Sequence, residues 1–225
     1  MISNTATKRP VCQYCLRPQR TCICQWITPI APTPEVLVLQ HPMEVGNAKG
    51  TARLLHLSLA GSRMQAGEAF EAQALHALLY ADAKTPVLLY PETPDHEALG
   101  LTPAPPLDKA VLQQPSQLQQ LRLVVLDGTW RKSRKMLYLN PLLQQLPRLP
   151  LHDPPASHYL IRKAHGEHQL STLEATCYAL MELEGDSGKY QALLQAFKGF
   201  VEQQGGYANL RPAKALSSND AKTTK

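Results

Sequence analysis

Four cysteines near the N-terminus have the residue type and the spacing of metal ligands. They are Cys12, Cys15, Cys22 and Cys24, and they form two closely spaced pairs. Four thiolates can enclose one Zn²⁺ tetrahedrally, which leaves the ion no open position and indicates a structural role. Because cytosolic thiols stay reduced, a metal site is favoured over disulfides. An iron–sulfur cluster and four free thiols are the alternatives.

The run Asp127-Gly128-Thr129-Trp130 combines residues that suit a ligand site. Asp127 follows a predicted buried strand, Gly128 allows a sharp turn, and Thr129 is a favourable N-cap for the next helix. A carboxylate, the positive end of a helix and the ring of Trp130 are therefore expected at one place. This combination suits a cationic or a nucleobase-bearing ligand. The alternative is a solvated basic helix with Trp130 in the core.

Basic residues favour a polyanionic partner. The chain has a formal net charge of +5 and a pI of about 9.0. Four cations follow Trp130 on one predicted helix, and such a cluster beside a site favours an RNA backbone. The candidate RNA-binding residues are Lys49, Arg53, Arg131, Lys132, Arg134, Lys135 and Lys163. Arg17 and Arg20, in the cysteine segment, are candidates for phosphate contacts or for plain solvation.

Three histidines and one cysteine raise further possibilities. His41 and Glu44 have side chains capable of acid–base chemistry, although a His-Pro pair is also a common turn. His165 and His168 lie close together, but no neighbouring carboxylate or thiol supports a metal site there, so phosphate contact or ordinary surface is favoured. Cys177 falls in a predicted helix and is expected in the core.

Short apolar runs alternate with helical patterns along the chain, and these elements must position the candidate residues. The strand candidates are Glu35–Gln40, Pro86–Tyr90, Leu121–Leu126 and His158–Arg162. The helix candidates are Ala48–Ala60, Ala69–Ala81, Thr129–Leu139, a helix from the capping box Ser171-Thr172-Leu173-Glu174 to Glu184, and Lys189–Gln203, which Gly205-Gly206 closes. Residues 92–120 are rich in Pro and Gln and predict an irregular loop with at most one short helix.

Strands that alternate with helices predict an α/β fold with a mostly parallel sheet and helices on both faces. Ligands of such sheets bind outside the carboxyl ends of the strands. These ends carry His41-Pro42, Tyr90-Pro91, Asp127-Gly128 and Lys163-Ala164. Polar groups and turn-forming residues therefore gather where a ligand site is expected.

Length and composition predict one main domain with a small module. The chain has 225 residues, of which 44% are hydrophobic. We expect a knuckle at residues 1–30, a main domain at 31–206 and a disordered tail at 207–225. No apolar run approaches about eighteen residues, which argues against a transmembrane span. The first residues lack the apolar stretch of a signal peptide, so we expect a cytoplasmic protein with no obligate protein partner.

Several motifs, taken in order, resemble those of the DTW-domain family. They are the knuckle Cys12–Cys24, His41-Pro42-Met43-Glu44, Asn47-Ala48-Lys49-Gly50-Thr51, Leu89-Tyr90-Pro91, Asp127–Trp130 with its basic helix, and Ser171-Thr172-Leu173-Glu174-Ala175. The resemblance covers nearly all of the chain except the two tails and residues 92–120. It implies that residues 31–206 form a catalytic domain related to the SPOUT methyltransferases, with a knotted C-terminal region, which is rare among folds.

The resemblance also implies a reaction and a partner. The implied activity transfers the 3-amino-3-carboxypropyl group of S-adenosylmethionine to N3 of a uridine in tRNA and releases methylthioadenosine. Asp127 is then the base that takes the N3 proton, or a ligand of the donor's amino group, and Trp130 shapes the site or stacks on a base. The implied contacts of S-adenosylmethionine are Tyr90, Pro91, Leu126, Asp127, Gly128, Thr129, Ser171, Thr172 and Glu174.

Two other functions stay open at this point. A SPOUT-like RNA methyltransferase would use the same donor but release S-adenosylhomocysteine. A non-catalytic zinc-knuckle protein would bind RNA without affinity for S-adenosylmethionine. The products and the binding of the donor therefore discriminate the three functions.

Overall fold

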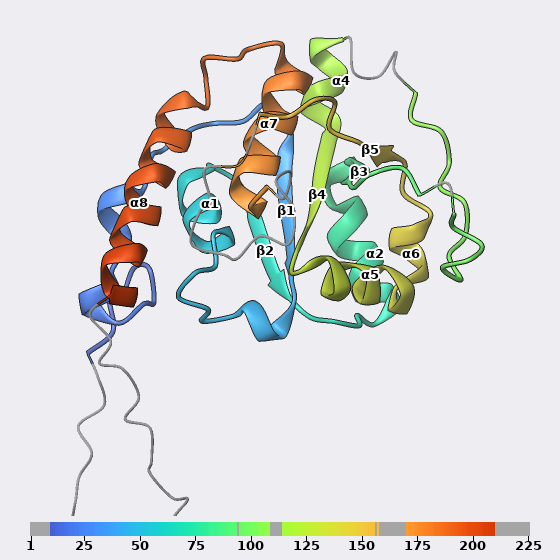
Figure 1. Cartoon of the computed structure of the whole chain (residues 1–225). Helices are drawn as coiled ribbons and strands as arrows, with labels where there is room; N and C mark the ends of the chain where they lie inside the picture. The colour runs from blue at the N-terminus through green and yellow to red at the C-terminus, as the bar shows by residue number, and fades with distance from the viewer. Residues whose placement is uncertain (1–9, 94, 109–113, 156, 158–169, 210–225) are drawn as a thin grey trace, which may run out of the picture.

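The computed structural model describes residues 10–93, 95–108, 114–155, 157 and 170–209. Its centre is a five-stranded sheet in the order β2-β1-β4-β3-β5, in which neighbouring strands are parallel (Figure 1). The strands are β1 (Glu35–Gln40), β2 (Arg63–Ala66), β3 (Thr85–Leu89), β4 (Leu121–Asp127) and β5 (Arg148–Leu149). The prediction of a parallel α/β sheet is confirmed.

The central strands are buried because both of their faces meet helices. In β1, Val36 and Val38 belong to one hydrophobic cluster, whereas Leu37 and Leu39 belong to a second cluster on the other face. Every residue of β4 is buried. Continuous apolar runs of this kind are typical of parallel strands covered on both sides.

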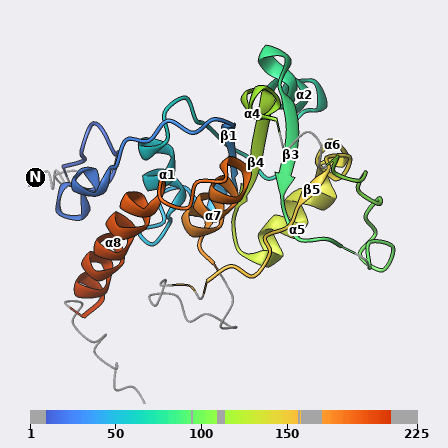
Figure 2. The ribbon, with the colours of Figure 1, turned by 90° about the horizontal axis from the view of Figure 1, so that it is seen from above.

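Helices form the layers on the two faces of the sheet (Figure 2). Leucines of α1 (Ala52–Ser58), α4 (Pro115–Gln120), α7 (Thr172–Glu184) and α8 (Gln191–Asn209) join the first cluster. Residues of α2 (Ala72–Tyr80), α5 (Trp130–Leu139) and α6 (Pro141–Gln144) join the second cluster. Short 3-10 helices occur at η1 (Gln19–Thr21), η2 (Cys24–Trp26), η3 (Pro42–Glu44) and η4 (Ala81–Ala83).

Two predicted helix starts are confirmed in detail. Thr129 is the N-cap of α5, and its hydroxyl oxygen accepts a hydrogen bond from the Lys132 amide at 3.4 Å. Ser171 and Glu174 form the capping box of α7, in which each side chain accepts a hydrogen bond from the other residue's amide. Both caps use donors within the first helical turn, so local sequence is sufficient to specify them.

Other elements differ from the prediction. β2 and β5 were not predicted, because β2 is a mostly exposed edge strand and β5 has two residues. The predicted closing role of Gly205-Gly206 is wrong, since α8 continues through both glycines to Asn209, three residues into the segment predicted as a tail. The first two helices are shorter than predicted, beginning after the N-caps Thr51 and Glu71.

Part of the prediction falls on residues for which no structure is described. The strand candidate His158–Arg162, Lys163 and most of the predicted tail lie outside the described residues. The knotted C-terminal region stays a prediction. The short helix allowed within residues 92–120 is α4.

The cysteine segment, near the start of the chain, packs against α8, near its other end. Figure 1 shows the two as neighbouring blue and red ribbons. The Trp26 ring lies against Gly199 of α8, where any Cβ would overlap with it. The Trp26 indole donates a hydrogen bond to the Gln203 side chain, and the Gln203 amide donates to the Cys22 carbonyl at 3.2 Å. The knuckle is therefore docked on the main domain through α8.

Candidate active site

The Asp127 carboxylate is held by three elements that meet at the carboxyl ends of β1 and β4. The parallel register pairs Asp127 with Gln40, whose side-chain amide donates to Oδ2 at 2.9 Å. The Thr172 hydroxyl, at the start of α7, donates to Oδ1 at 2.6 Å. Asp127 is only 5% exposed. This buried carboxylate is thus oriented by partners at both of its oxygens.

His41 follows β1 and is fixed beside the same strand end. Its amide donates to the Asp127 carbonyl at 2.9 Å. Ring atom Nδ1 accepts from the Met43 amide at 3.1 Å, so the proton of a neutral ring lies on Nε2, which contacts Glu68 Oε1 at 2.8 Å. Hydrogen bonds from Lys135 and from His41 lower the pKa of the Glu68 carboxyl. Sequence reasoning missed Glu68, which lies 27 residues from His41 and has no local motif.

Glu44 provides a second buried carboxylate near α5. Lys132 Nζ lies 2.7 Å from its Oε1, and the Asn47 side-chain amide donates to Oε2 at 2.8 Å. Lys135 similarly pairs with Glu68 at 2.9 Å. Two of the four α5 cations that were predicted to contact RNA are therefore engaged by carboxylates of the protein.

The capping box explains which residue of α7 faces the site. Ser171 and Glu174 satisfy each other's backbone amides, and the Ser157 hydroxyl also donates to Glu174 at 2.8 Å. The Leu173 amide donates to the Thr51 hydroxyl at 3.3 Å. Of the two hydroxyl residues that open this helix, Thr172 is the one that contacts Asp127.

Gly128 has a packing role that differs from the prediction. Its φ is not positive, so the turn does not require the conformational freedom of glycine. A Cβ at this position would lie 3.1 Å from Lys132 Cβ and 3.6 Å from His41 Cβ. The small residue therefore allows α5 to approach the loop after β1 closely.

Tyr90 connects the Asp127 region to β5 through aromatic contacts. Its ring meets the Trp130 ring edge-on with the centroids 5.7 Å apart, and the Arg148 guanidinium carbon lies 5.6 Å from the Tyr90 centroid. Tyr90 is buried, and this burial raises its pKa. Trp130 is 50% exposed, which excludes the alternative that placed it in the core.

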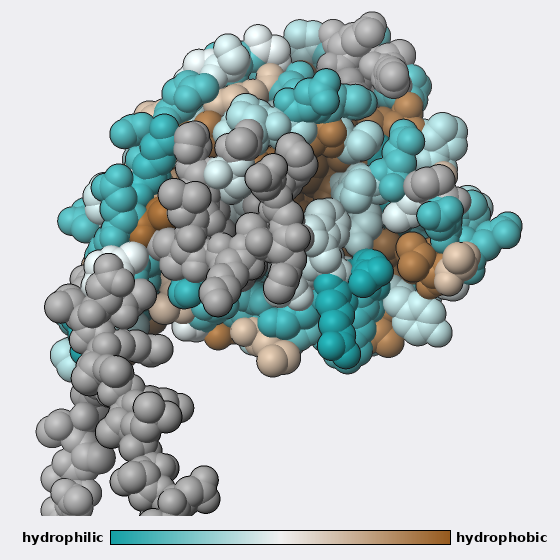
Figure 3. Space-filling view, viewed as in Figure 1, coloured by the Kyte–Doolittle hydropathy of each residue, from teal (hydrophilic) through white to brown (hydrophobic). Residues whose placement is uncertain are grey.

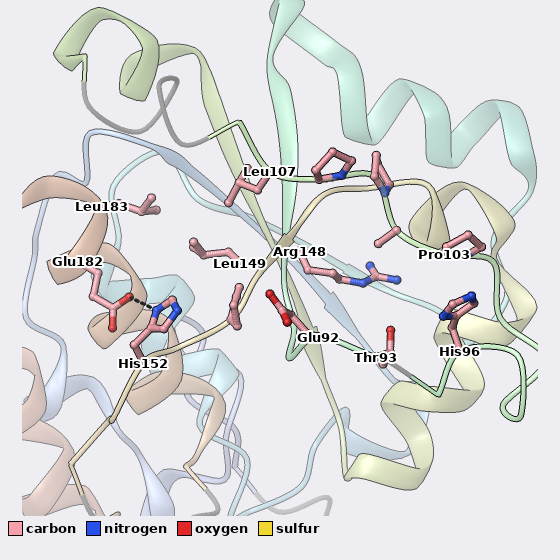
Figure 4. A pocket seen from close by; sticks show the side chains of 14 residues that line it. Glu92, Thr93, His96, Pro103, Leu107, Arg148, Leu149, His152, Glu182 and Leu183 are labelled. Carbon is pink, nitrogen blue, oxygen red and sulfur yellow. Dashed lines mark ion pairs between the residues drawn. The ribbon is translucent and has the colours of Figure 1, made fainter.

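A cavity of about 760 Å³ opens beside the carboxyl ends of β3 and β5 (Figure 4). Glu92, Thr93 and His96 line it after β3, and Arg148, Leu149 and His152 line it from β5 onward. Prolines of the loop 103–106, together with Leu107, Glu182 and Leu183, complete the lining. None of the residues predicted to contact the donor lines this cavity, but Glu92 directly follows Tyr90-Pro91, and Arg148 contacts Tyr90.

The surface around this region is mixed in polarity. The face seen in Figure 3 is hollowed, with hydrophobic residues inside the hollow and polar residues along the coloured part of its rim. Such a combination of an apolar recess and a polar rim is typical of sites for small molecules.

The four N-terminal cysteines have the geometry of a tetrahedral metal site. Their sulfur atoms all lie within 4.8 Å of one another, with Cys12 and Cys24 at 3.6 Å and Cys15 and Cys22 at 3.7 Å. A tetrahedral zinc–thiolate site with Zn–S bonds of about 2.3 Å separates its sulfurs by about 3.8 Å. Hydrogen bonds from the backbone at Cys15 and Tyr14 lower the pKa of Cys12 to about 6, whereas burial raises the pKa of Cys24 to about 12. The donor set therefore fits Zn²⁺.

The family is decided by the match along the sequence. The sequence profile described as "DTW domain" matches residues 9–205, which include the cysteines, α7 and most of α8. The chain belongs to the DTW domain family.

Several relatives of this chain are named tRNA-uridine aminocarboxypropyltransferases. The chain is 29% identical to tRNA-uridine aminocarboxypropyltransferase 2 of Mus musculus, over 91% of this chain and 68% of the relative. It is 29% identical to the protein of the same name from Drosophila melanogaster, over 90% of this chain and 78% of the relative. No solved structure matches the chain.

Within this DTW domain, the remaining predicted residues lie in different surroundings. Arg131 and Arg134 are exposed on α5, and Lys49 is exposed in the loop before α1. The Arg53 guanidinium donates to the Tyr14 carbonyl at 3.1 Å, so it contacts the knuckle. Pro91 is exposed, and Leu126 is buried in the sheet.

The helices that the structure describes include none with the length and hydrophobicity needed to cross a membrane.

Proposed function

We propose that this protein transfers the 3-amino-3-carboxypropyl group of S-adenosylmethionine to N3 of a uridine in tRNA. Membership of the DTW domain family and the name shared by its relatives support tRNA modification. The observation that carries the proposal is the buried carboxylate of Asp127, which opens the run Asp127-Gly128-Thr129-Trp130 and accepts hydrogen bonds from Gln40 and Thr172. It lies at the strand ends, where α/β sheets bind their ligands.

The cavity beside the carboxyl ends of β3 and β5 supports a donor of the size of S-adenosylmethionine. Small-molecule sites usually enclose about 300–1,000 Å³, and the volume of about 760 Å³ falls in that range. Tyr90 connects the cavity, through Arg148, with the exposed ring of Trp130. We therefore assign the donor to the cavity and the acceptor uridine to the side on which Trp130 lies.

The proposed reaction is a displacement at carbon. N3 of the uridine forms a bond to the methylene carbon that is attached to the sulfonium in the amino-acid arm. The bond between that carbon and sulfur breaks, and its electron pair stays on the sulfur of methylthioadenosine. Methyl transfer would use a different carbon of the same donor, so positioning decides the product.

N3 of uridine must also lose its proton, and we assign this proton to Asp127. Gln40 and Thr172 donate to the carboxylate and fix its orientation at the carboxyl end of β4. His41 is less suited to be the base, because its two ring nitrogens contact Met43 and Glu68. A contact of Asp127 with the donor's amino group is the alternative role.

The tRNA side of the site is assigned to α5 and its surroundings. Arg131, Arg134 and Lys135 are exposed beside the half-exposed Trp130. Cations bind phosphates without sequence preference, whereas an aromatic ring stacks on a base. We assign phosphate contacts to the cations and a base contact to Trp130.

The cysteine knuckle is proposed to hold one structural Zn²⁺. Cys12, Cys15, Cys22 and Cys24 would supply all four ligands, and the ion would therefore stabilise the fold of the knuckle. No residue of the site beside Asp127 belongs to this donor set.

Mass spectrometry of the nucleosides of tRNA, after incubation with the protein and S-adenosylmethionine, tests the proposed function. We expect aminocarboxypropyl-uridine in the tRNA and an equal amount of methylthioadenosine in solution. Methylated nucleosides together with S-adenosylhomocysteine would instead identify a methyltransferase. Binding of tRNA without any affinity for S-adenosylmethionine would identify a non-catalytic RNA-binding protein.

A further inference from the structure

We propose that Arg148 binds the carboxylate of the donor's amino-acid arm inside the cavity. This inference rests on the proposed function, because it names the donor as the ligand. Arg148 lines the cavity and is only 6% exposed. Figure 4 shows its guanidinium directed toward the part of the cavity where Thr93, His96 and Pro103 lie.

The hydrogen bonds of Arg148 are incomplete within the described part of the chain. Nη1 donates to the Leu143 carbonyl at 3.0 Å. Nε and Nη2 are buried and have no acceptor. The guanidinium carbon lies 5.6 Å from the centroid of the Tyr90 ring, but the ring is not an acceptor for Nε or Nη2. Buried donors without acceptors are rare in folded proteins and call for a partner.

The charge of Arg148 points to the same conclusion. The ion pairs formed by described residues include none between Arg148 and a carboxylate. Its burial lowers the pKa of the guanidinium. A buried cation is costly unless an anion pairs with it. By contrast Arg122, the other buried arginine of the sheet, pairs with Glu35 at 2.9 Å.

The two nitrogens without acceptors define the shape of the missing partner. Nε and Nη2 lie on one edge of the guanidinium plane, and their N–H groups point in the same direction. This edge accepts a planar carboxylate through two parallel hydrogen bonds. S-adenosylmethionine has one carboxylate, in the arm that is transferred, and methylthioadenosine has none. A carboxylate contact at Arg148 would therefore distinguish the donor from the product.

A phosphate of tRNA is the other anion that such an edge could bind. The lining favours the smaller ligand, because proline and leucine side chains form much of the cavity that Arg148 lines. An RNA backbone carries many negatively charged phosphates, and proteins usually bind them at exposed cationic surfaces. Arg148 is buried, unlike Arg131 and Arg134.

Calorimetry on the full-length protein and on Arg148→Gln tests this inference with three ligands. They are S-adenosylmethionine, its decarboxylated analogue, which keeps the amino group, and methylthioadenosine. We expect the substitution to weaken S-adenosylmethionine binding roughly 10- to 150-fold, the usual effect of losing a charged hydrogen-bonded contact. Affinity for the other two ligands should stay unchanged. Arg63→Gln, which removes an exposed guanidinium from β2, is the control and should bind all three ligands normally.

Each other result has a defined meaning. Absence of S-adenosylmethionine binding by the wild-type protein would contradict the proposed function and this inference together. Normal binding by Arg148→Gln would contradict only the role of Arg148. Equal losses for all three ligands would show that Arg148 supports the fold of the cavity, and weaker tRNA binding alone would assign it to a phosphate. If the glutamine variant does not fold, Arg148→Lys replaces it. Lysine keeps the positive charge but lacks the edge on which two nitrogens donate in parallel. Unchanged affinity of this variant for S-adenosylmethionine would again contradict the inference.

Discussion

The hydroxyl of Thr172 donates a hydrogen bond of 2.6 Å to Oδ1 of Asp127, although 45 residues separate the two in sequence. Thr172 is the first residue of α7, and Asp127 is the last residue of β4. The capping box at Ser171 and Glu174 fixes the start of α7 and hence the position of the Thr172 hydroxyl. The start of one helix thus orients the carboxylate at the end of a strand.

Replacement of Thr172 should reveal this positioning role. Thr172→Val removes the hydroxyl but keeps the shape, so we expect turnover to fall roughly tenfold, the usual effect of losing one hydrogen bond to a charged group. The KM for tRNA should change little, because the substitution acts on Asp127. Thr172→Ser should restore most of the rate. A loss that serine does not restore would indicate that packing of the methyl group, and not the hydrogen bond, is what matters.

Replacement of Asp127 discriminates its two proposed roles. Asp127→Asn keeps the size but removes the proton acceptor. If Asp127 is the base, turnover should fall roughly 10²–10⁴-fold with donor affinity nearly unchanged. If it binds the donor's amino group, affinity for S-adenosylmethionine and for its decarboxylated analogue should fall, while methylthioadenosine binds as before. Wild-type rates and affinities would show that Asp127 serves only the structure of the strand end.

The cations of α5 should contribute unequally to tRNA binding. Lys132 and Lys135 pair with Glu44 and Glu68, so we choose the exposed Arg131 and Arg134 for reversal. The double change to Glu should weaken tRNA binding and reduce the slope of its salt dependence by roughly one for each lost phosphate contact. Donor affinity should stay normal.

Lys84→Glu provides the control for this experiment. Lys84 directly precedes β3 at the amino edge of the sheet, away from the strand ends that carry Asp127. Its reversal should leave the salt slope unchanged. Equal slopes for the wild-type protein and the Arg131/Arg134 double variant would assign these two arginines to ordinary surface.

The knuckle should contain one metal ion that stabilises the fold. Elemental analysis of protein purified without added metal should give about one equivalent of zinc per chain. Cys12→Ser should lower the thermal stability of the knuckle more than it lowers the affinity for S-adenosylmethionine. Iron in place of zinc would indicate a cluster. Four thiols that react freely in the native protein, with no metal, would contradict the assignment.

Docking of the knuckle should affect the loop before α1. Arg17 donates to the carbonyls of Ala48 and Gly50, each at 2.7 Å, and its guanidinium lies over the Phe200 ring at 5.3 Å. Arg17→Ala should therefore increase amide hydrogen exchange in residues 47–51 while zinc content stays at the wild-type value. Arg20→Ala, in the same knuckle, is the matched comparison. Unchanged exchange in the Arg17 variant would show that its hydrogen bonds do not hold this loop.

The ion pairs of Glu68 should make stability depend on acid pH. Lys135 and His41 lower the pKa of Glu68 in the folded protein, so its contribution is present above the ordinary carboxyl pKa and is lost as the pH falls through the lowered value. Glu68→Gln should therefore reduce the melting temperature near neutral pH, and the difference from wild type should shrink in acid. Glu97→Gln, at an exposed carboxylate, is the control. A difference that does not vary with pH would exclude an ionic contribution of Glu68.

Features that depend on near neighbours were predictable from the sequence. The knuckle spacing, the N-cap Thr129 and the capping box of α7 were all predictable, because their interactions join residues a few positions apart. The buried strands β1 and β4 were predictable from their apolar runs. The order of the strands in the sheet does not follow from these local patterns, because it depends on how the helices pack on the sheet.

The side chains that meet at the site were not predictable in this way, because tertiary contacts bring them together. Gln40 and Thr172 reach Asp127 from 87 and 45 residues away, and Lys132 reaches Glu44 from 88 residues away. Arg148 lies in a strand of two residues, too short to show any periodicity, and sequence reasoning missed it. Local patterns arise from backbone hydrogen bonds and from side chains on one helical turn or strand. The partners of a buried charge are set instead by the order and register of the strands, which bring distant segments together.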